Sequence, residues 1–149
     1  MEISNILSPN RVINNGTVSS KKAALEALAN LISSAEPNLT QAEVFESLIA
    51  REKLGSTSLG NGIALPHGRQ KGGTQAIGAF IQLHEGIQYD TVDLEPVDLL
   101  FALSVPEEST EEHLEILSKL ASILSDSSLV NNIRSCDSPE SIFTILTKQ

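Results

Sequence analysis

The spacing of hydrophobic residues predicts helices near both ends of the chain. Apolar residues recur every three or four positions over 20–34 and 40–53, and each segment begins with a residue able to cap a helix. The second segment opens with Thr40 and Glu43, a capping box in which each side chain bonds the other's backbone. Further helices with the same spacing are expected over 109–124, 128–134 and 138–146.

The helix expected over 109–124 is predicted in most detail. The run Ser109-Thr110-Glu111-Glu112 supplies a second capping box at its start. Its buried stripe is expected to consist of Leu114, Leu117, Ala121 and Leu124.

Nearly continuous apolar runs predict strands in the middle of the chain. Residues 97–105 (VDLLFALSV) suit a central strand buried on both faces. Residues 76–83 predict a second strand, and 87–89 a short third one. Residues 55–73 contain six of the nine glycines, which indicates a loop, with a brief strand expected at 63–65. Helices alternating with strands predict an α/β fold.

The composition describes an acidic chain of one-domain size. Its 149 residues carry 10 Lys plus Arg against 19 Asp plus Glu, a net charge of −9 that repels nucleic acid and anionic membranes. No apolar run approaches the ~18 residues of a membrane helix, and the first residues lack a signal-peptide pattern. The single Cys136 can form no internal disulfide. We therefore expect one domain over 1–149 in the cytoplasm, with no nucleic-acid partner and no membrane insertion.

Positive charge is concentrated beside the glycine-rich stretch. Residues 51–71 contain four basic side chains and one acidic one, whereas residues 72–118 contain ten acidic side chains and no Lys or Arg. Basic side chains together with exposed backbone N–H groups form anion sites. The stretch is therefore a candidate anion site, and a solvated loop with ordinary surface charges is the alternative.

Known nucleotide and metal motifs do not fit this stretch. Residues 55–60 satisfy the first half of a P-loop, but Asn61 and Gly62 stand where the Lys and the Ser or Thr belong. A G-x-G-x-x-G pattern starts at Gly60, but Leu65 occupies its third glycine position. The three histidines complete no metal pattern with Cys, Asp or Glu. We expect neither a cofactor nor a metal.

His67 is the first candidate for a reactive group. Pro66 fixes the backbone before it, and Gly68 after it leaves room for an incoming group. An imidazole held in this way can act as a nucleophile or proton carrier near neutral pH; the alternative is a loop histidine with a structural hydrogen bond. His113 falls in the first turn of a predicted helix, where it could help to hold an anion, or could be an ordinary surface histidine.

Residues 51–68, with the sequence REKLGSTSLGNGIALPHG, closely resemble a known active-site signature. It is the signature of phosphotransferase-system IIA domains of the mannitol/fructose/nitrogen-regulatory class. The similarity continues through 96–106 (PVDLLFALSVP) and the pair His113-Leu114, and it covers most of the chain.

The resemblance implies a mixed sheet flanked by helices on both faces. It implies that His67 is phosphorylated on its ring Nε2 by a histidine-phosphorylated carrier of the HPr type. It gives His113 and Arg51 catalytic roles beside His67. Transfer between two imidazoles needs in-line approach and stabilisation of charged oxygens, and no metal or nucleotide. The residues expected to bind the phosphoryl group are Arg51, Thr57, Asn61, Gly68 and His113.

The branch of the family is indicated by the run G-N-G-I-A that contains Asn61. Sugar-transporting members often have Glu at this position, so the chain is more similar to nitrogen-regulatory IIA proteins, in which the phosphate is a signal. Ser58 and Leu65 depart mildly from that branch, where Gly and Ile are common. The alternatives are an IIA component that passes phosphate to a IIB domain during sugar uptake, and a binding module that is never phosphorylated.

Overall fold

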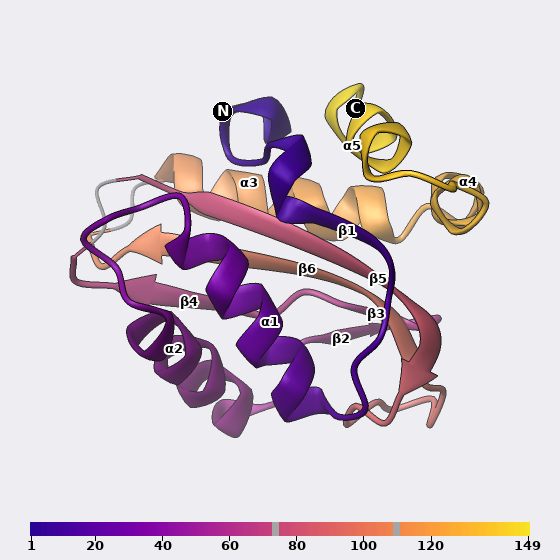
Figure 1. The fold of residues 1–149 in the computed structure, drawn as a ribbon, viewed down its shortest axis with the longest axis horizontal. Coiled ribbons are helices and arrows are strands. Elements are labelled where there is room, and N and C mark those ends of the chain that lie inside the picture. The colour runs from indigo at the N-terminus through magenta and orange to yellow at the C-terminus, as the bar shows by residue number, and fades with distance from the viewer. Residues whose placement is uncertain (73–74, 109–110) are drawn as a thin grey trace.

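Helices cover both faces of a six-stranded sheet (Figure 1). The computed structural model describes residues 1–72, 75–108 and 111–149. Two short 3-10 helices, Ile3–Asn5 and Pro9–Arg11, precede the sheet. Its strands are β1 (Val12–Gly16), β2 (Ser58–Gly60), β3 (Ile63–Ala64), β4 (His67–Gln70), β5 (Ile77–Ile87) and β6 (Val97–Pro106). The helices are α1 (Lys21–Ser33), α2 (Gln41–Leu54), α3 (Glu111–Leu124), α4 (Ser127–Arg134) and α5 (Pro139–Thr147).

The sheet is mixed, and β6 lies at its centre. The strand order is β1-β5-β6-β3-β2, and β4 also pairs with β6. Strand β5 runs antiparallel to β6, whereas β3 and β4 run parallel to it. The central strand predicted over 97–105 is therefore confirmed, and so is the single α/β domain with a mixed sheet.

Successive residues of β6 point into two separate cores. Leu99, Phe101 and Leu103 pack with α3, α4 and α5, while Leu100 and Ala102 pack with α1 and α2. All five side chains are fully buried, which explains why this strand reads as an unbroken apolar run.

The predicted helix caps are formed as expected for α1, α2 and α5. Thr40 and Glu43 make the reciprocal capping box, with each backbone N–H donating to the other side chain at 3.1 Å. Ser20 and Ser138 accept hydrogen bonds from the third residue that follows each of them. These caps supply partners for backbone N–H groups that a helix start leaves unpaired.

The buried face of α3 differs from the predicted stripe. Ile116, Leu120 and Leu124 are buried, whereas Leu114 is 59% exposed. The stripe is rotated because the sheet lies on one side of α3 and a pocket, described below, on the other. The capping box expected at Ser109 and Thr110 lies outside the described residues.

Two further expectations were wrong in their extent, and one strand was missed. The predicted loop over 55–73 contains β2 and β4 as well as β3, so His67 begins a strand. The strand expected over 76–83 is longer and runs to Ile87 as β5, and residues 88 and 89 of the expected short strand lie outside it. Strand β1 was not predicted; it pairs in parallel with β5 at the sheet edge.

Strands β3 and β4 follow one another along one edge of β6, and this pairing places His67. Both strands pair with the same edge of β6, where Ala64 lies opposite Leu100 and His67 opposite Leu103. Between them, Leu65 N–H donates to the Thr57 carbonyl at 3.0 Å. Pro66 has no N–H to donate, but its carbonyl accepts from the Leu103 N–H at 3.0 Å, so the alignment with β6 is kept between β3 and β4.

Gly68 allows α2 to approach β4 closely. A Cβ added to Gly68 would lie 3.0 Å from the carbonyl carbon and oxygen of Ser47 and would overlap its hydroxyl. That hydroxyl donates to the Arg69 carbonyl at 3.0 Å, so helix and strand are also joined by a hydrogen bond. The glycine thus serves helix packing, a role that the sequence did not predict.

We expect Gly68→Ala to destabilise the fold by about 1–3 kcal/mol, because the added methyl group forces α2 away from the sheet. Urea unfolding of the two proteins measures the difference. An unchanged unfolding midpoint and slope would show that α2 can shift at no cost.

Candidate active site

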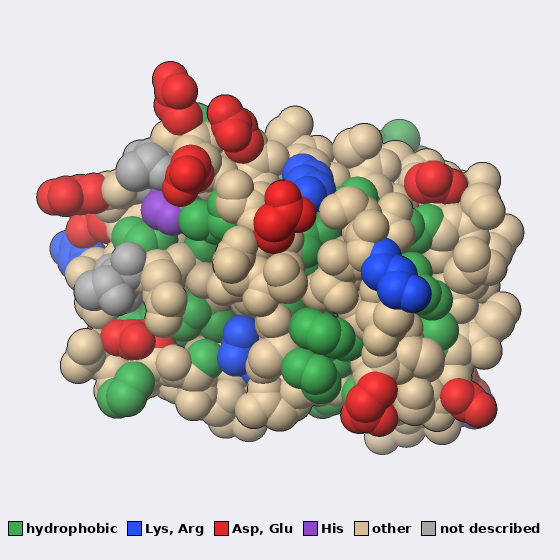
Figure 2. All heavy atoms as spheres, turned by 90° about the horizontal axis from the view of Figure 1, so that it is seen from above, with side chains coloured by type: hydrophobic (Ala, Val, Ile, Leu, Met, Phe, Trp, Pro, Cys, Tyr) green, Lys and Arg blue, Asp and Glu red, His purple; other side chains and the backbone are tan. Residues whose placement is uncertain are grey.

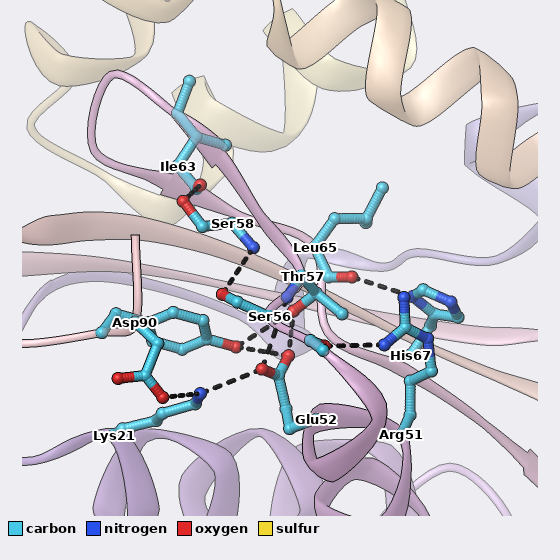
Figure 3. Close-up of polar contacts among 12 residues, drawn as sticks. Lys21, Arg51, Glu52, Ser56, Thr57, Ser58, Ile63, Leu65, His67 and Asp90 are labelled. Carbon is cyan, nitrogen blue, oxygen red and sulfur yellow. Dashed lines mark hydrogen bonds and ion pairs between the residues drawn. The ribbon is translucent and has the colours of Figure 1, made fainter. Parts of the chain in front are cut away.

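A pocket of about 530 Å³ lies where α2, β4, β6 and α3 meet. Four residues of the predicted site line it: His67, Arg51, Gly68 and His113. Figure 3 shows His67 and Arg51 side by side at this end of α2. The remaining lining residues are Ser47, Ala50, Leu54, Arg69, Leu103, Val105, Leu114 and Leu117.

The ring of His67 has a defined orientation and tautomer. Its Nδ1 lies 2.9 Å from the Leu65 carbonyl oxygen (Figure 3). A carbonyl can only accept, so Nδ1 carries the proton of the neutral ring. The lone pair of the neutral ring therefore resides on Nε2, the nitrogen available to an incoming group.

The surroundings of His67 favour its neutral form. Burial lowers the pKa of His67 below its usual 6.5, and the positive charge of Arg51 lowers it further. The hydrogen bond to Leu65 and the negative charge of Glu52 raise the pKa, but the net shift is downward. At neutral pH the ring is thus an uncharged nucleophile.

Arg51 lies in the last turn of α2 and is held at the pocket. Its Nη1 donates to the Gly55 carbonyl at 2.8 Å. A guanidinium carries five N–H donors, so this bond leaves others for an anion in the pocket. Arg69, on β4, is the other arginine of the lining.

His113 enters the pocket from the opposite side. It is the third residue of α3 and is half-buried. The end of the molecule where α3 begins carries a gathering of acidic side chains (Figure 2). The exposed acidic residues there include Glu107, Glu108, Glu111 and Glu112. The pocket therefore has arginines on its α2 and β4 side and carboxylates outside its α3 side.

Thr57 and Asn61 lie away from this pocket, unlike the expectation that they line it. Thr57 is buried, and its hydroxyl bonds to the Glu52 carboxylate. Asn61, at the β2–β3 turn, has a left-handed backbone (φ 55°), and its N–H donates to Asp93 at 3.0 Å. Neither residue is among those that line the pocket with His67.

Sequence reasoning missed two features of this pocket. Its lining is largely apolar, with Leu103 and Val105 from β6 and Leu114 and Leu117 from α3, whereas a glycine-lined hollow was expected. Glu52, next to Arg51, is buried although it is acidic. The burial of Glu52 could have been suspected from its place at helical spacing after Leu48.

The described part of the chain holds no cluster of three or more His, Cys, Asp or Glu residues suited to a metal. Within the same residues, no helix has the length and apolarity needed to cross a bilayer.

Comparison with known proteins identifies the family. The family model for "Phosphoenolpyruvate-dependent sugar phosphotransferase system, EIIA 2" matches residues 5–149. The chain belongs to this EIIA 2 family. This finding confirms the resemblance of residues 51–68 and makes the chain a component of the phosphotransferase system.

Several of the proteins that the chain resembles are nitrogen regulatory proteins. The chain is 42% identical to the one from Pseudomonas aeruginosa, over 98% of this chain and 95% of the relative. It is 40% identical to the one from Klebsiella oxytoca, over 99% of this chain and 91% of the relative. The crystal structure of IIA-Ntr from Neisseria meningitidis matches with a TM-score of 0.91 and 45% identity, over 97% of this chain and 99% of that one. The fold is thus that of a nitrogen-regulatory IIA protein.

We expect Arg51→Gln to raise the pKa of His67, because it removes a positive charge that disfavours the imidazolium. A titration of the ring by NMR measures the shift against the parent protein, in which His67 titrates below 6.5.

The same lowered pKa links His67 to stability. Between the folded-state pKa and about 6.5 the unfolded chain binds more protons than the folded one, so stability falls as the pH drops through that window. The fall is expected to be shallower in Arg51→Gln. An unchanged pKa in the variant would mean that Arg51 does not act on the ring.

Proposed function

We propose that this protein is a phosphocarrier that accepts a phosphoryl group on Nε2 of His67. The donor is a histidine-phosphorylated carrier of the HPr type, that of the nitrogen branch, and the phosphorylated protein acts as a cytoplasmic regulatory signal. The observation that carries the proposal is the His67 ring, whose Nδ1 is bound by the Leu65 carbonyl while the ring lines a pocket with Arg51 and His113.

The transfer needs no proton movement. The Nε2 lone pair of neutral His67 attacks the phosphorus of the donor phosphohistidine, which is protonated on its other ring nitrogen. The donor N–P bond breaks, and its electron pair returns to the donor ring, which leaves as neutral imidazole. His67 becomes a phosphoimidazolium that keeps its Nδ1 proton and its bond to Leu65. The carbonyl dipole stabilises the positive charge that forms on the ring.

The residues around His67 suit the other requirements of the reaction. Arg51 and His113 lie on two sides of the pocket and can meet the charged phosphoryl oxygens. Leu54 and Leu114 are 85% and 59% exposed at the pocket, which suits contact with a partner protein. Two histidines can then meet across an interface.

The alternative function is that of an IIA component that hands phosphate to a IIB domain in fructose- or mannitol-type sugar uptake. Asn61 in the run G-N-G-I-A and the similarity to nitrogen regulatory proteins favour the regulatory role. A binding module without phosphorylation would have no need for His67, Arg51 and His113 in one pocket.

We expect the protein to be labelled by phosphoenolpyruvate in the presence of enzyme I and an HPr-type carrier. The label should be labile in acid and stable in base, as a phosphorus–nitrogen bond is, and His67→Ala should abolish it. His84→Ala is the matched control, because His84 is exposed and bonds Asn15 outside the pocket. Full labelling of His67→Ala would refute the assignment.

Arg51→Ala should slow labelling by about 10²–10³-fold, the usual effect of losing one donor to a developing charge, and should leave the fold intact. Rapid-quench kinetics gives the rate, and circular dichroism checks the fold. If the variant is unfolded, Arg51 has a structural role instead.

The two phosphocarrier roles differ in the fate of the label. Incubation of the labelled protein with an isolated IIB domain of the fructose or mannitol type should leave the label on His67. Rapid and complete loss of the label to the IIB domain would favour sugar uptake.

A further inference from the structure

The carboxylate of Glu52, the residue after Arg51, is buried and is fully occupied by hydrogen-bond donors. Its side chain is 4% exposed. Lys21 Nζ lies 3.0 Å from Oε2, and Tyr89 Oη donates to Oε1 at 2.8 Å. Thr57 donates to the same carboxylate through its hydroxyl and, at 3.4 Å, through its N–H (Figure 3). One buried charge thus joins the start of α1, the end of α2, the segment after α2 and the end of β5.

Hydrogen bonds lead from this carboxylate to the ring of His67. The Thr57 hydroxyl and N–H are held by Glu52, and the Thr57 carbonyl accepts the Leu65 N–H at 3.0 Å. The Leu65 carbonyl in turn binds Nδ1 of His67 at 2.9 Å. Each link is a peptide group or a fixed side chain, so the place of Thr57 decides where the Leu65 carbonyl points.

A second set of hydrogen bonds connects Glu52 to Arg51. The Gly55 N–H donates to the Glu52 carbonyl at 3.1 Å, and the Gly55 carbonyl accepts from Arg51 Nη1 at 2.8 Å. Gly55 has φ 154°, a conformation that favours glycine, and it is followed two residues later by Thr57. Holding Thr57 therefore also fixes the carbonyl that positions the guanidinium.

We propose that Glu52 is a positioning residue for His67, acting through Thr57 and Leu65, and that it also fixes Arg51 through the segment 55–57. The proposal rests on the function proposed above. It gives Thr57, whose side chain lies away from the pocket, an indirect role in holding the His67 ring.

A purely stabilising role accounts less well for these contacts. Removing a carboxylate from water is costly, and apolar residues of similar volume often give equal or greater stability. Here one of the donors, Thr57, is hydrogen-bonded to Leu65, the residue whose carbonyl holds the His67 ring. The tautomer of His67 depends on this carboxylate. Without the bond to the Leu65 carbonyl, a neutral imidazole prefers its proton on Nε2. A proton there removes the lone pair needed for attack.

Glu52→Gln tests the proposal, because it keeps the shape of the side chain and removes its charge. Long-range proton–nitrogen NMR of the ring reports which nitrogen of His67 is protonated. We expect the parent protein to have the proton on Nδ1 and the variant to move toward Nε2. Labelling by the HPr-type carrier should slow by about 10–100-fold, the usual cost of losing a residue that orients a reactive group.

Glu36→Gln is the matched control. Glu36 is also a buried glutamate, 8% exposed, but it lies in the α1–α2 connection and its carboxylate accepts from Asn38. This variant should lose stability without any change in the His67 tautomer or in the labelling rate.

Thr57→Val and Thr57→Ser form a second pair that does not depend on the folding of Glu52→Gln. The valine removes only the hydroxyl that bonds Glu52, whereas serine retains it. We expect the valine variant to shift the tautomer and slow labelling, and the serine variant to match the parent protein.

The outcomes separate this inference from the proposed function. A parent-like tautomer in both Glu52→Gln and Thr57→Val would overturn the positioning role, whatever the labelling rates. A shifted tautomer in those variants, in a protein whose native form is never labelled, would support the positioning of His67 and refute the phosphocarrier function.

Discussion

Strand β6 needs hydrogen-bond partners along both of its edges, because both of its faces are buried. Strand β5 supplies one edge along nearly its whole length. The other edge is divided between β3 and β4, with Leu65 and Pro66 crossing the gap between them. The Pro66 carbonyl bonds to β6 across this gap, while the Leu65 N–H bonds to Thr57 and the Leu65 carbonyl to the His67 ring. The position of the candidate active site thus follows from how β3 and β4 pair with the second edge of the buried strand β6.

Much of the fold could be predicted from the sequence because its signals are local. Capping residues and apolar spacing identify α1 and α2, and an apolar run identifies β6. Strand β1 escaped prediction because its sequence, Val-Ile-Asn-Asn-Gly, contains three residues that are uncommon in strands. It is held in the sheet by pairing with β5, which lies far away in the sequence. The buried face of α3 was misjudged because Leu114 fits the helical spacing but lies at the pocket.

The candidate site was predicted unevenly for a similar reason. His67, Arg51 and His113 were named from their residue types and from a family signature, and the structure brings them to one pocket. The surroundings of Thr57 were not foreseen, because they depend on Lys21 and on Tyr89, which the chain brings from distant elements. No local sequence pattern predicts which hydrogen-bond donors surround a buried carboxylate such as that of Glu52.

The apolar lining of the pocket bears on how long a phosphoryl group would persist. Phosphorus bound to an imidazolium nitrogen is readily lost to water, so the lifetime of such a group depends on solvent access. Leu103, Val105 and Leu117 offer no hydrogen bond to a water molecule placed for in-line attack. A partner that covers the exposed Leu54 and Leu114 would dry the pocket further during the encounter. The hydrocarbon around His67 would therefore work against hydrolysis and leave a second imidazole as the favoured acceptor.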